Sequence, residues 1–233
     1  MKQKNGAYKV SIKGRESMLV NGKLDRQVLW KELHAKHKKQ RTKIRLRLEE
    51  FQRIRPEQYF YELVYCLLTP QSSAVHAAKV QHQLKKHRFH EMKLDPETFL
   101  RQKETYIRFH RTKSRLLLLM KAQFPEILTI LASGKSAYDI REWLVRHVRG
   151  FGYKESTHFL RNIGKNEGLA ILDRHILRNL VNLRVIRSVP QTLTRKQYLA
   201  LEEKFQQFAL EVAIPIDELD LLFWSEETGQ ILK

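Results

Sequence analysis

Residues 148–180 read VRGFGYKESTHFLRNIGKNEGLAILDRHILRNL, and this stretch decides the fold. Gly150 and Gly152 separate two segments whose apolar residues recur at helical spacing. Glycine adopts positive φ readily and leaves backbone amides exposed, and amides at a helix N-terminus bind phosphate well. The pattern therefore predicts two helices joined by a tight turn that can hold a nucleic-acid backbone. An ordinary helix C-cap followed by a new helix is the alternative.

Helical periodicity covers most of the chain from Ile44 onward. Pro56 suits the first turn of a helix, and Ser72 or Ser73 can cap the next one. The expected helices cover residues 59–68, a helix capped at 72 or 73 that runs to 86, a short segment after 95–96, 114–123, a new helix from 125, 137–147, 153–162, 173–183 and 194–212. Because there is no internal repeat and no alternation of strands with helices, the sequence predicts an all-α fold of roughly nine or ten helices.

The charge of the chain is strongly positive and unevenly distributed. Its 44 Lys and Arg against 25 Asp and Glu give a formal net charge of +19. Residues 1–50 contain 15 basic and five acidic side chains, whereas residues 211–233 contain six acidic side chains and Lys233. A charge this large favours a polyanionic partner. Nucleic acid fits better than a membrane surface, because no basic amphipathic helix stands out.

Composition also excludes several classes of protein. The single cysteine, Cys66, lies in the apolar run LVYCLL and is expected in the core. One cysteine cannot form an intrachain disulfide or a four-cysteine zinc or iron–sulfur site. The first residues contain no apolar signal segment, and no apolar run is long enough to span a bilayer. We therefore expect an intracellular soluble protein.

The N-terminal segment differs from the helical remainder, and we expect a boundary between residues 1–40 and residues 41–233. The segments AYKVSI (7–12) and SMLV (17–20) have strand-like content, and an Asn-Gly turn signal follows them. Two interpretations of this basic extension stay open. It is either a partly ordered tail, or a small β-hairpin or arm lying on DNA phosphates.

Two residues of the decisive stretch carry reactive side chains 19 positions apart. Lys154 falls in the first turn of the second helix, and a free amine can attack a carbonyl-like carbon to form a Schiff base. Asp173 follows an apolar segment at the start of another helix, where its carboxylate could stabilise positive charge on a reacting sugar. Taken alone, Lys154 is as readily an exposed phosphate-binding lysine, and Asp173 an ordinary N-cap.

The motifs G-F-G-Y-K (150–154) and L-D-R-H (172–175) resemble the signature of the helix-hairpin-helix superfamily of DNA glycosylases. The lysine marks the bifunctional branch of that superfamily, which also cleaves the DNA strand. GYKESTHFLRNIG and LAILDRHILR are similar to the archaeal-type, or type 2, 8-oxoguanine DNA glycosylase/AP lyases. The resemblance covers residues 41–233 and includes RLRLEEF, LLTPQSSA, RFHRTKSRLL and LDLLFWSEETGQILK. Arg149 stands where the family usually has a proline, which bears on the rigidity of the turn.

The resemblance implies two helical subdomains with the active site in the cleft between them. It implies a monomeric enzyme that binds double-stranded DNA containing oxidised guanine. Such an enzyme excises 8-oxoguanine and cleaves the strand by β-elimination, without a metal or another cofactor. Lys154 would be the nucleophile and Asp173 its carboxylate partner. A cytoplasmic location, on the nucleoid when bound to DNA, follows from that activity.

The resemblance also assigns recognition residues. Trp224 and the terminal Lys233 would recognise the extruded base, while Phe109 and His110 would form the opposite wall of its pocket. Gln71 would fill the gap that the extruded nucleotide leaves. Core packing is the alternative for Trp224 and Phe109, and a helix linker for the segment around Gln71. The other expected DNA contacts are Arg149, Gly150, Gly152, Lys113, Arg115 and His175.

Two alternative functions stay open on the sequence. A glycosylase of the same scaffold could act on another lesion, such as an oxidised pyrimidine or a mismatched base, because Lys154 and Asp173 do not distinguish between them. A non-enzymatic helical protein that binds DNA or RNA would account for the net charge of +19. It gives no reason for Lys154, Asp173 and Lys233 to occur together. Salt-dependent binding without lesion preference would favour it.

Overall fold

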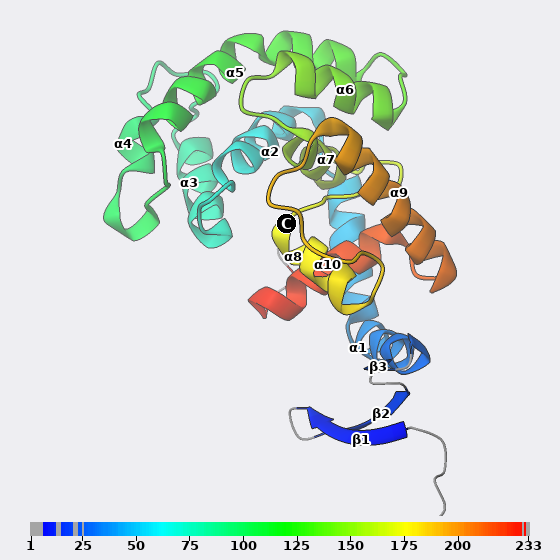
Figure 1. Ribbon diagram of the computed structural model, residues 1–233. Coiled ribbons are helices and arrows are strands. Elements are labelled where there is room, and N and C mark those ends of the chain that lie inside the picture. Colours follow the sequence, from blue (N-terminus) through cyan, green and yellow to red (C-terminus); the bar gives the residue numbers. More distant parts are fainter. Residues whose placement is uncertain (1–6, 13–14, 21–22, 25, 230, 232–233) are drawn as a thin grey trace, which may run out of the picture.

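The computed structural model describes residues 7–12, 15–20, 23–24, 26–229 and 231. In these residues, three short strands precede ten α-helices and one 3-10 helix (Figure 1). The elements are β1 (Ala7–Ile12), β2 (Arg15–Val20), β3 (Lys23–Leu24), α1 (Arg26–Gln52), α2 (Pro56–Leu68), α3 (Ala74–Lys86), α4 (Glu97–Leu100), η1 (Lys103–Thr105), α5 (His110–Leu131), α6 (Ala137–His147), α7 (Tyr153–Asn162), α8 (Arg174–Asn182), α9 (Arg195–Glu211) and α10 (Ile216–Thr228). The predicted all-α class is confirmed for the chain from α1 onward.

Two apolar cores divide the helices into two subdomains. The first core lies among α2–α7 and includes Phe60, Phe89 and Phe159. The second lies among α1 and α8–α10 and includes Phe205 and Phe223. Figure 1 shows α2–α6 gathered at one side of the molecule and α8–α10 at the other, with α7 between them. This arrangement confirms the two predicted helical subdomains.

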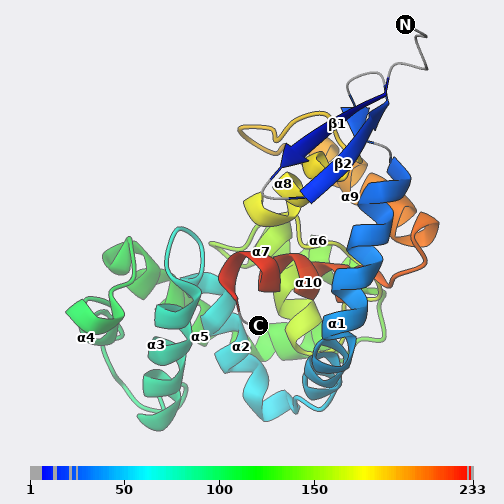
Figure 2. The same ribbon diagram turned by 90° about the horizontal axis from the view of Figure 1, so that it is seen from below.

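Helix α1 runs through residues 40 and 41, where the sequence predicts a boundary. Leu33, His37 and Ile44 on α1 are buried. Helix α1 packs against α10, which crosses it (Figure 2). The charged residues between these positions hide the pattern in the sequence, because only about one residue in every two turns of the helix is buried. The helical part of the chain therefore begins at Arg26 rather than at residue 41.

Ion pairs explain why a basic N-terminal half and an acidic C-terminus occur in one chain. Helix α1 supplies the basic partners, and α9 and α10 supply the acidic ones. The pairs are Arg26–Glu211 at 2.8 Å, Lys36–Glu226 at 2.8 Å, His37–Glu218 at 2.5 Å and Arg45–Glu218 at 2.8 Å. The C-terminal acidic residues thus fix α10 against α1. Pairs like these contribute little where both side chains are exposed, whereas removing the partner of a buried charge such as Glu218 is costly.

The strands before α1 form a three-stranded antiparallel sheet in the order β1-β2-β3. In the pairing of β1 with β2, Ala7 is opposite Val20. Of the two interpretations of the N-terminal segment, these strands correspond to the small hairpin. The turn expected at Asn21 and Gly22 lies outside the described residues.

The prediction that helices end and begin between residues 123 and 125 is wrong. Helix α5 continues through Pro125 to Leu131. A proline inside a helix costs about 3 kcal/mol, because it removes a backbone donor and clashes with the preceding turn. Phe124 and Ile127 are buried in the same core as the preceding turns of α5, so their burial outweighs that cost.

A buried ion pair joins the two subdomains. Arg141 on α6 has 0% of its surface exposed, and its two terminal nitrogens donate to Glu202 on α9 at 2.6 and 2.8 Å. Glu202 also accepts a hydrogen bond from the backbone amide of Ala170, three residues before Asp173. This pair therefore supports both the contact between the subdomains and the segment that leads to Asp173.

We predict that Glu202→Gln lowers the free energy of unfolding by about 3 kcal/mol, because it leaves the buried guanidinium of Arg141 without a carboxylate. Urea denaturation followed by circular dichroism measures the change. Glu203→Gln is the matched control, because Glu203 is exposed on the same helix. Equal stability of the two variants would contradict the role given to the pair.

Candidate active site

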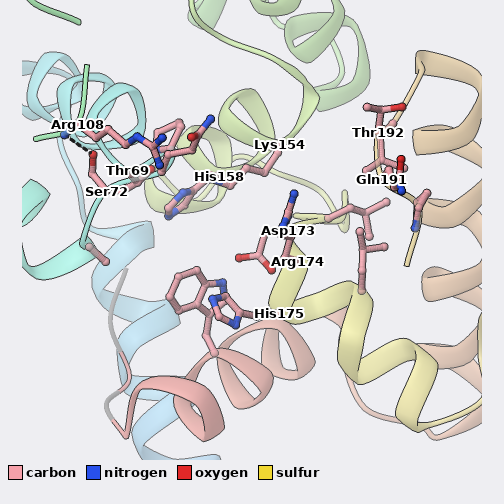
Figure 3. Close-up of a pocket in the computed structure, with 18 of the residues that line it drawn as sticks. Thr69, Ser72, Arg108, Lys154, His158, Asp173, Arg174, His175, Gln191 and Thr192 are labelled. Carbon is pink, nitrogen blue, oxygen red and sulfur yellow. Dashed lines mark hydrogen bonds between the residues drawn. The ribbon is translucent and has the colours of Figure 1, made fainter. Parts of the chain in front are cut away.

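A cavity of about 740 Å³ lies between the two subdomains. Its walls come from the α2–α3 segment, from Arg108 before α5, from α7, from the start of α8, from the α8–α9 segment and from α10. Within the described residues, the cavity lining brings together five of the side chains that the sequence predicts for the site: Gln71, Lys154, Asp173, His175 and Trp224. Figure 3 shows Lys154, Asp173 and His175 among them. These residues therefore lie together in a cavity between the subdomains, and their roles there stay predictions.

Lys154 is fixed by the way α7 begins. It occupies the second position of that helix, and its side chain is 24% exposed. Glu155 lies beside it, with Oε1 3.5 Å from the Lys154 Nζ, while Oε2 accepts a hydrogen bond from the Gly152 amide at 3.1 Å. One carboxylate therefore caps α7 and also faces the amine. The amine keeps access to the cavity (Figure 3).

Asp173 is the N-cap of α8. Its Oδ1 accepts a hydrogen bond from the Ile176 amide at 2.8 Å, which fixes the side chain at the end of the helix. The preceding residues, Ala170–Leu172 in sequence, are buried in or beside the second core. Figure 3 shows Asp173 in the middle of the cavity wall, below Lys154. Asp173 therefore both caps α8 and lines the cavity.

The sequence interpretation missed a buried carboxylate that interacts electrostatically with this pair. Asp220 on α10 is buried, and Arg161 on α7 donates to its Oδ2 at 2.9 Å. Burial raises the pKa of Asp220 to about 7, while the guanidinium of Arg161 opposes that rise. The charges of Asp173 and Lys154 also act on this pKa, with opposite signs. The protonation of Asp220 therefore depends on the charges of the groups around it.

Gln71 lies in the short segment between α2 and α3 that forms one edge of the cavity. Its φ is 55°, in the left-handed region that non-glycine residues seldom occupy. A strained residue at a cavity edge persists only where its surroundings hold it. Here the Ser72 hydroxyl accepts a hydrogen bond from the Arg108 amide at 3.0 Å, so the segment is tied to the one before α5 (Figure 3).

Trp224 on α10 is half-buried and lines the cavity. Its ring lies 5.1 Å from the ring of His175, at an angle of 57° between the planes. The second core also contacts it, so Trp224 is partly a core residue and partly a cavity wall. Lys233 lies outside the described residues. The carbonyl of Ile231 accepts a weak hydrogen bond from Arg47 on α1 at 3.4 Å.

Comparison with known proteins decides the family. A family model described as 8-oxoguanine DNA glycosylase matches residues 44–214. A relative from Fusobacterium nucleatum, named 8-oxoguanine DNA glycosylase/AP lyase, is 39% identical over 213 residues, covering 87% of this chain and 96% of the relative. The chain belongs to the 8-oxoguanine DNA glycosylase family. This confirms the family that the motifs around Lys154 and Asp173 predict.

Solved structures of the 8-oxoguanine DNA glycosylase family share this architecture. The enzyme from Thermotoga maritima gives a TM-score of 0.79 at 28% identity, over 90% of this chain and 100% of that chain. The 8-oxoguanine glycosylase/lyase from Methanocaldococcus jannaschii, in complex with a 15mer DNA containing 8-oxoguanine, gives a TM-score of 0.77 at 32% identity. That comparison covers 87% of this chain and 100% of the other.

Other residues that the family resemblance assigns lie outside the cavity lining. Phe109 is 49% exposed, stacks against the Arg108 guanidinium at 4.9 Å and precedes α5 with a φ of 60°. The Nδ1 of His110 lies 3.3 Å from Glu97. Arg108, their neighbour, lines the cavity instead. Phe109 and His110 therefore lie next to a cavity residue, and their role in base recognition stays a prediction.

The environment of Lys113 differs from the one expected of a residue that contacts phosphate. Its side chain is buried, and its amine donates to the carbonyls of Leu68 and Pro70 rather than facing solvent. Arg115, two residues later, is exposed. The difference arises because the carbonyl partners come from α2 and the segment after it, more than 40 residues away in sequence.

The glycine turn between α6 and α7 has the predicted form but uses its two glycines differently. Gly150 has a φ of 90°, and a Cβ there would lie 2.8 Å from Leu67 and from Leu116, so only glycine fits. Gly152 is extended and serves as the N-cap of α7, contrary to the expectation of positive φ. Arg149 and Gly150 are exposed, as a surface that holds DNA requires.

Tyr65 and His158 are cavity residues that the sequence interpretation missed. Their rings meet edge to face at 5.7 Å, and burial raises the pKa of Tyr65. His158 is four positions after Lys154 on α7, so it lies on the same helix face. That spacing is a signal that could have identified His158. Tyr65 lies in a continuous apolar run, in which nothing marks a cavity position.

Proposed function

We propose that this chain excises 8-oxoguanine from DNA and then cleaves the strand, with Lys154 as nucleophile and Asp173 as its carboxylate partner. The observation that carries the proposal is that the two residues share one cavity between the subdomains of a member of the 8-oxoguanine DNA glycosylase family. The relative from Fusobacterium nucleatum carries the name of both activities, glycosylase and AP lyase.

The proposed reaction begins with extrusion of the damaged nucleotide into the cavity, because the bond to be broken is inaccessible inside the duplex. The neutral amine of Lys154 attacks C1′ of the sugar, the bond between C1′ and the base breaks, and the base leaves with a proton. Asp173 stabilises the positive charge that develops at C1′. The sugar ring opens to a Schiff base on Lys154, C2′ loses a proton, and the C3′–O bond breaks.

Double-stranded DNA would contact the rim of the cavity. Arg149, Gly150 and Arg115 are exposed and can face phosphates. The Gly152 amide already donates to Glu155, so it binds phosphate only when Glu155 releases it. Gln71, at the cavity edge, would fill the gap in the duplex. Among the described residues, no helix is both long and apolar enough to cross a membrane.

Recognition of the base would use Trp224, with its neighbour His175, as one wall of the cavity. The aromatic ring of Trp224 offers a face on which a flipped base can stack. Lys233 would add an amine and the terminal carboxylate. Phe109 and His110 would act from the rim, beside Arg108. These assignments decide which lesion is excised, whereas Lys154 and Asp173 decide what reaction follows.

A panel of lesion duplexes tests the proposed function. We expect the purified chain to cleave duplexes containing 8-oxoguanine and to leave undamaged guanine intact. With borohydride present, a covalent adduct should form on the same duplex, because reduction traps the Schiff base. Faster excision of an oxidised pyrimidine or of a mismatched base would instead support a related glycosylase. Binding without cleavage or lesion preference would support a non-enzymatic nucleic-acid-binding protein.

A further inference from the structure

The amine of Lys113 is buried at the junction of two segments that border the cavity. Lys113 lies in the first turns of α5, and 6% of its surface is exposed. Its Nζ donates to the carbonyl of Leu68 at 2.7 Å, to the carbonyl of Pro70 at 2.7 Å and to the Ser72 hydroxyl at 3.2 Å. An ammonium group has three donors, and these three acceptors use all of them.

The hydrogen bonds of Lys113 and Ser72 connect the α2–α3 segment to the segment before α5. Ser72 accepts from the Lys113 amine and also from the Arg108 amide at 3.0 Å. Each segment contains a non-glycine residue in the left-handed region, Gln71 with a φ of 55° and Phe109 with a φ of 60°. Such conformations cost roughly 1–3 kcal/mol each and persist where the surrounding contacts impose them.

The chemistry of this contact differs from that of a phosphate site. A lysine that binds DNA phosphate offers its ammonium to solvent, where release of counterions drives the association. The Lys113 ammonium faces backbone carbonyls instead. Burial, together with repulsion from Lys154, lowers its pKa to about 8, while Glu155 opposes the change. The amine is therefore within electrostatic reach of Lys154 while its hydrogen bonds are directed at the cavity edge.

We propose that Lys113 is a positioning residue that holds Gln71 at the cavity edge and so controls extrusion of the damaged nucleotide. This inference rests on the proposed function, in which Gln71 fills the gap in the duplex. With the Lys113 amine in place, the α2–α3 segment is preformed and pays no ordering cost when DNA binds. Without it, the carbonyls of Leu68 and Pro70 lose their donor and Gln71 relaxes from its left-handed conformation.

The test compares two duplexes that differ only in the cost of extrusion. In one duplex 8-oxoguanine is paired with cytosine, and in the other it lies opposite a base-free site, so extrusion breaks no base pair. We expect Lys113→Met to slow single-turnover excision from the paired duplex by about tenfold or more, and from the unpaired duplex by less than about threefold. Fluorescence of 2-aminopurine placed next to the lesion should show slower unstacking.

Lys121→Met is the matched control. Lys121 lies on the same helix, and its amine also donates to two backbone carbonyls, of Phe89 at 2.6 Å and of Met92 at 2.8 Å. These contacts are not part of the cavity lining. Lys121→Met should therefore keep the wild-type ratio of the two excision rates, whatever it does to stability.

Each other outcome is informative. Equal slowing of both duplexes by Lys113→Met, or no slowing of either, would overturn the positioning role. If Lys113→Met does not fold, Ser72→Ala removes the shared acceptor and should change the ratio in the same direction by about threefold. An unchanged ratio in Ser72→Ala would then overturn the proposal. Failure of the wild-type chain to excise 8-oxoguanine from either duplex would refute the proposed function itself, with no bearing on how Lys113 holds Gln71.

Discussion

Lys154→Gln is expected to remove excision and strand cleavage together, by at least about 10³-fold, because glutamine keeps the length and polarity of the side chain but has no nucleophilic amine. Borohydride trapping should give no adduct with this variant. DNA binding should stay within a few-fold of the wild type, because Lys154 lies inside the cavity rather than on the exposed rim. Single-turnover kinetics on an 8-oxoguanine duplex and a binding titration measure the two effects.

The matched control for this prediction is Lys165→Gln, which removes the same charge from an exposed position just beyond α7. It separates loss of the nucleophile from loss of general attraction to DNA. A trapped adduct formed by Lys154→Gln would show that another amine is the nucleophile.

The parts of this site that depend on local sequence could be predicted, and the parts that depend on tertiary burial could not. The turn around Gly150, the position of Lys154 and the cap at Asp173 each follow from a few neighbouring residues, and the structure has all three. Lys154 and Asp173 meet in the folded chain because the starts of α7 and α8 both line the cavity.

Lys113 shows why the rest could not be predicted. In the sequence it is one lysine in a basic segment, and such a lysine is most often exposed. Its burial depends on carbonyls of Leu68 and Pro70, which only the packing of α2 against α5 brings near. The position of Arg108 at the cavity wall and the interaction of Asp220 with Asp173 depend in the same way on contacts between distant segments.

The predicted helix boundaries were wrong where the burial of side chains opposed the local sequence signal. Pro125 predicts a helix start, but the buried face that includes Phe124 and Ile127 keeps α5 continuous. Charge obscures the first half of α1 in a similar way, because Leu33 and His37 are its only buried residues before Ile44. In both helices the sequence contains the apolar positions, and their partners on other elements decide how far the helix runs.

Asp173→Asn is expected to slow base excision by about 10²–10³-fold while leaving the fold intact. The amide oxygen of asparagine can accept the hydrogen bond from the Ile176 amide that Asp173 now accepts at 2.8 Å, so α8 keeps its cap. The negative charge is lost. Because positive charge develops at C1′ as the base leaves, excision should suffer more than cleavage of a preformed base-free site, which already presents an aldehyde to Lys154.

Two measurements distinguish this role from a purely structural one. Single-turnover rates on an 8-oxoguanine duplex and on a base-free duplex give the loss of base excision relative to the loss of strand cleavage. The melting temperature shows whether α8 keeps its N-cap. Asp139→Asn is the control, because Asp139 is an exposed first-turn residue of α6 that makes a capping contact with Ser136. Equal losses on both duplexes, or a drop in melting temperature that accounts for the lost rate, would reduce Asp173 to a helix cap. A loss confined to excision would place its carboxylate against the sugar as the base departs.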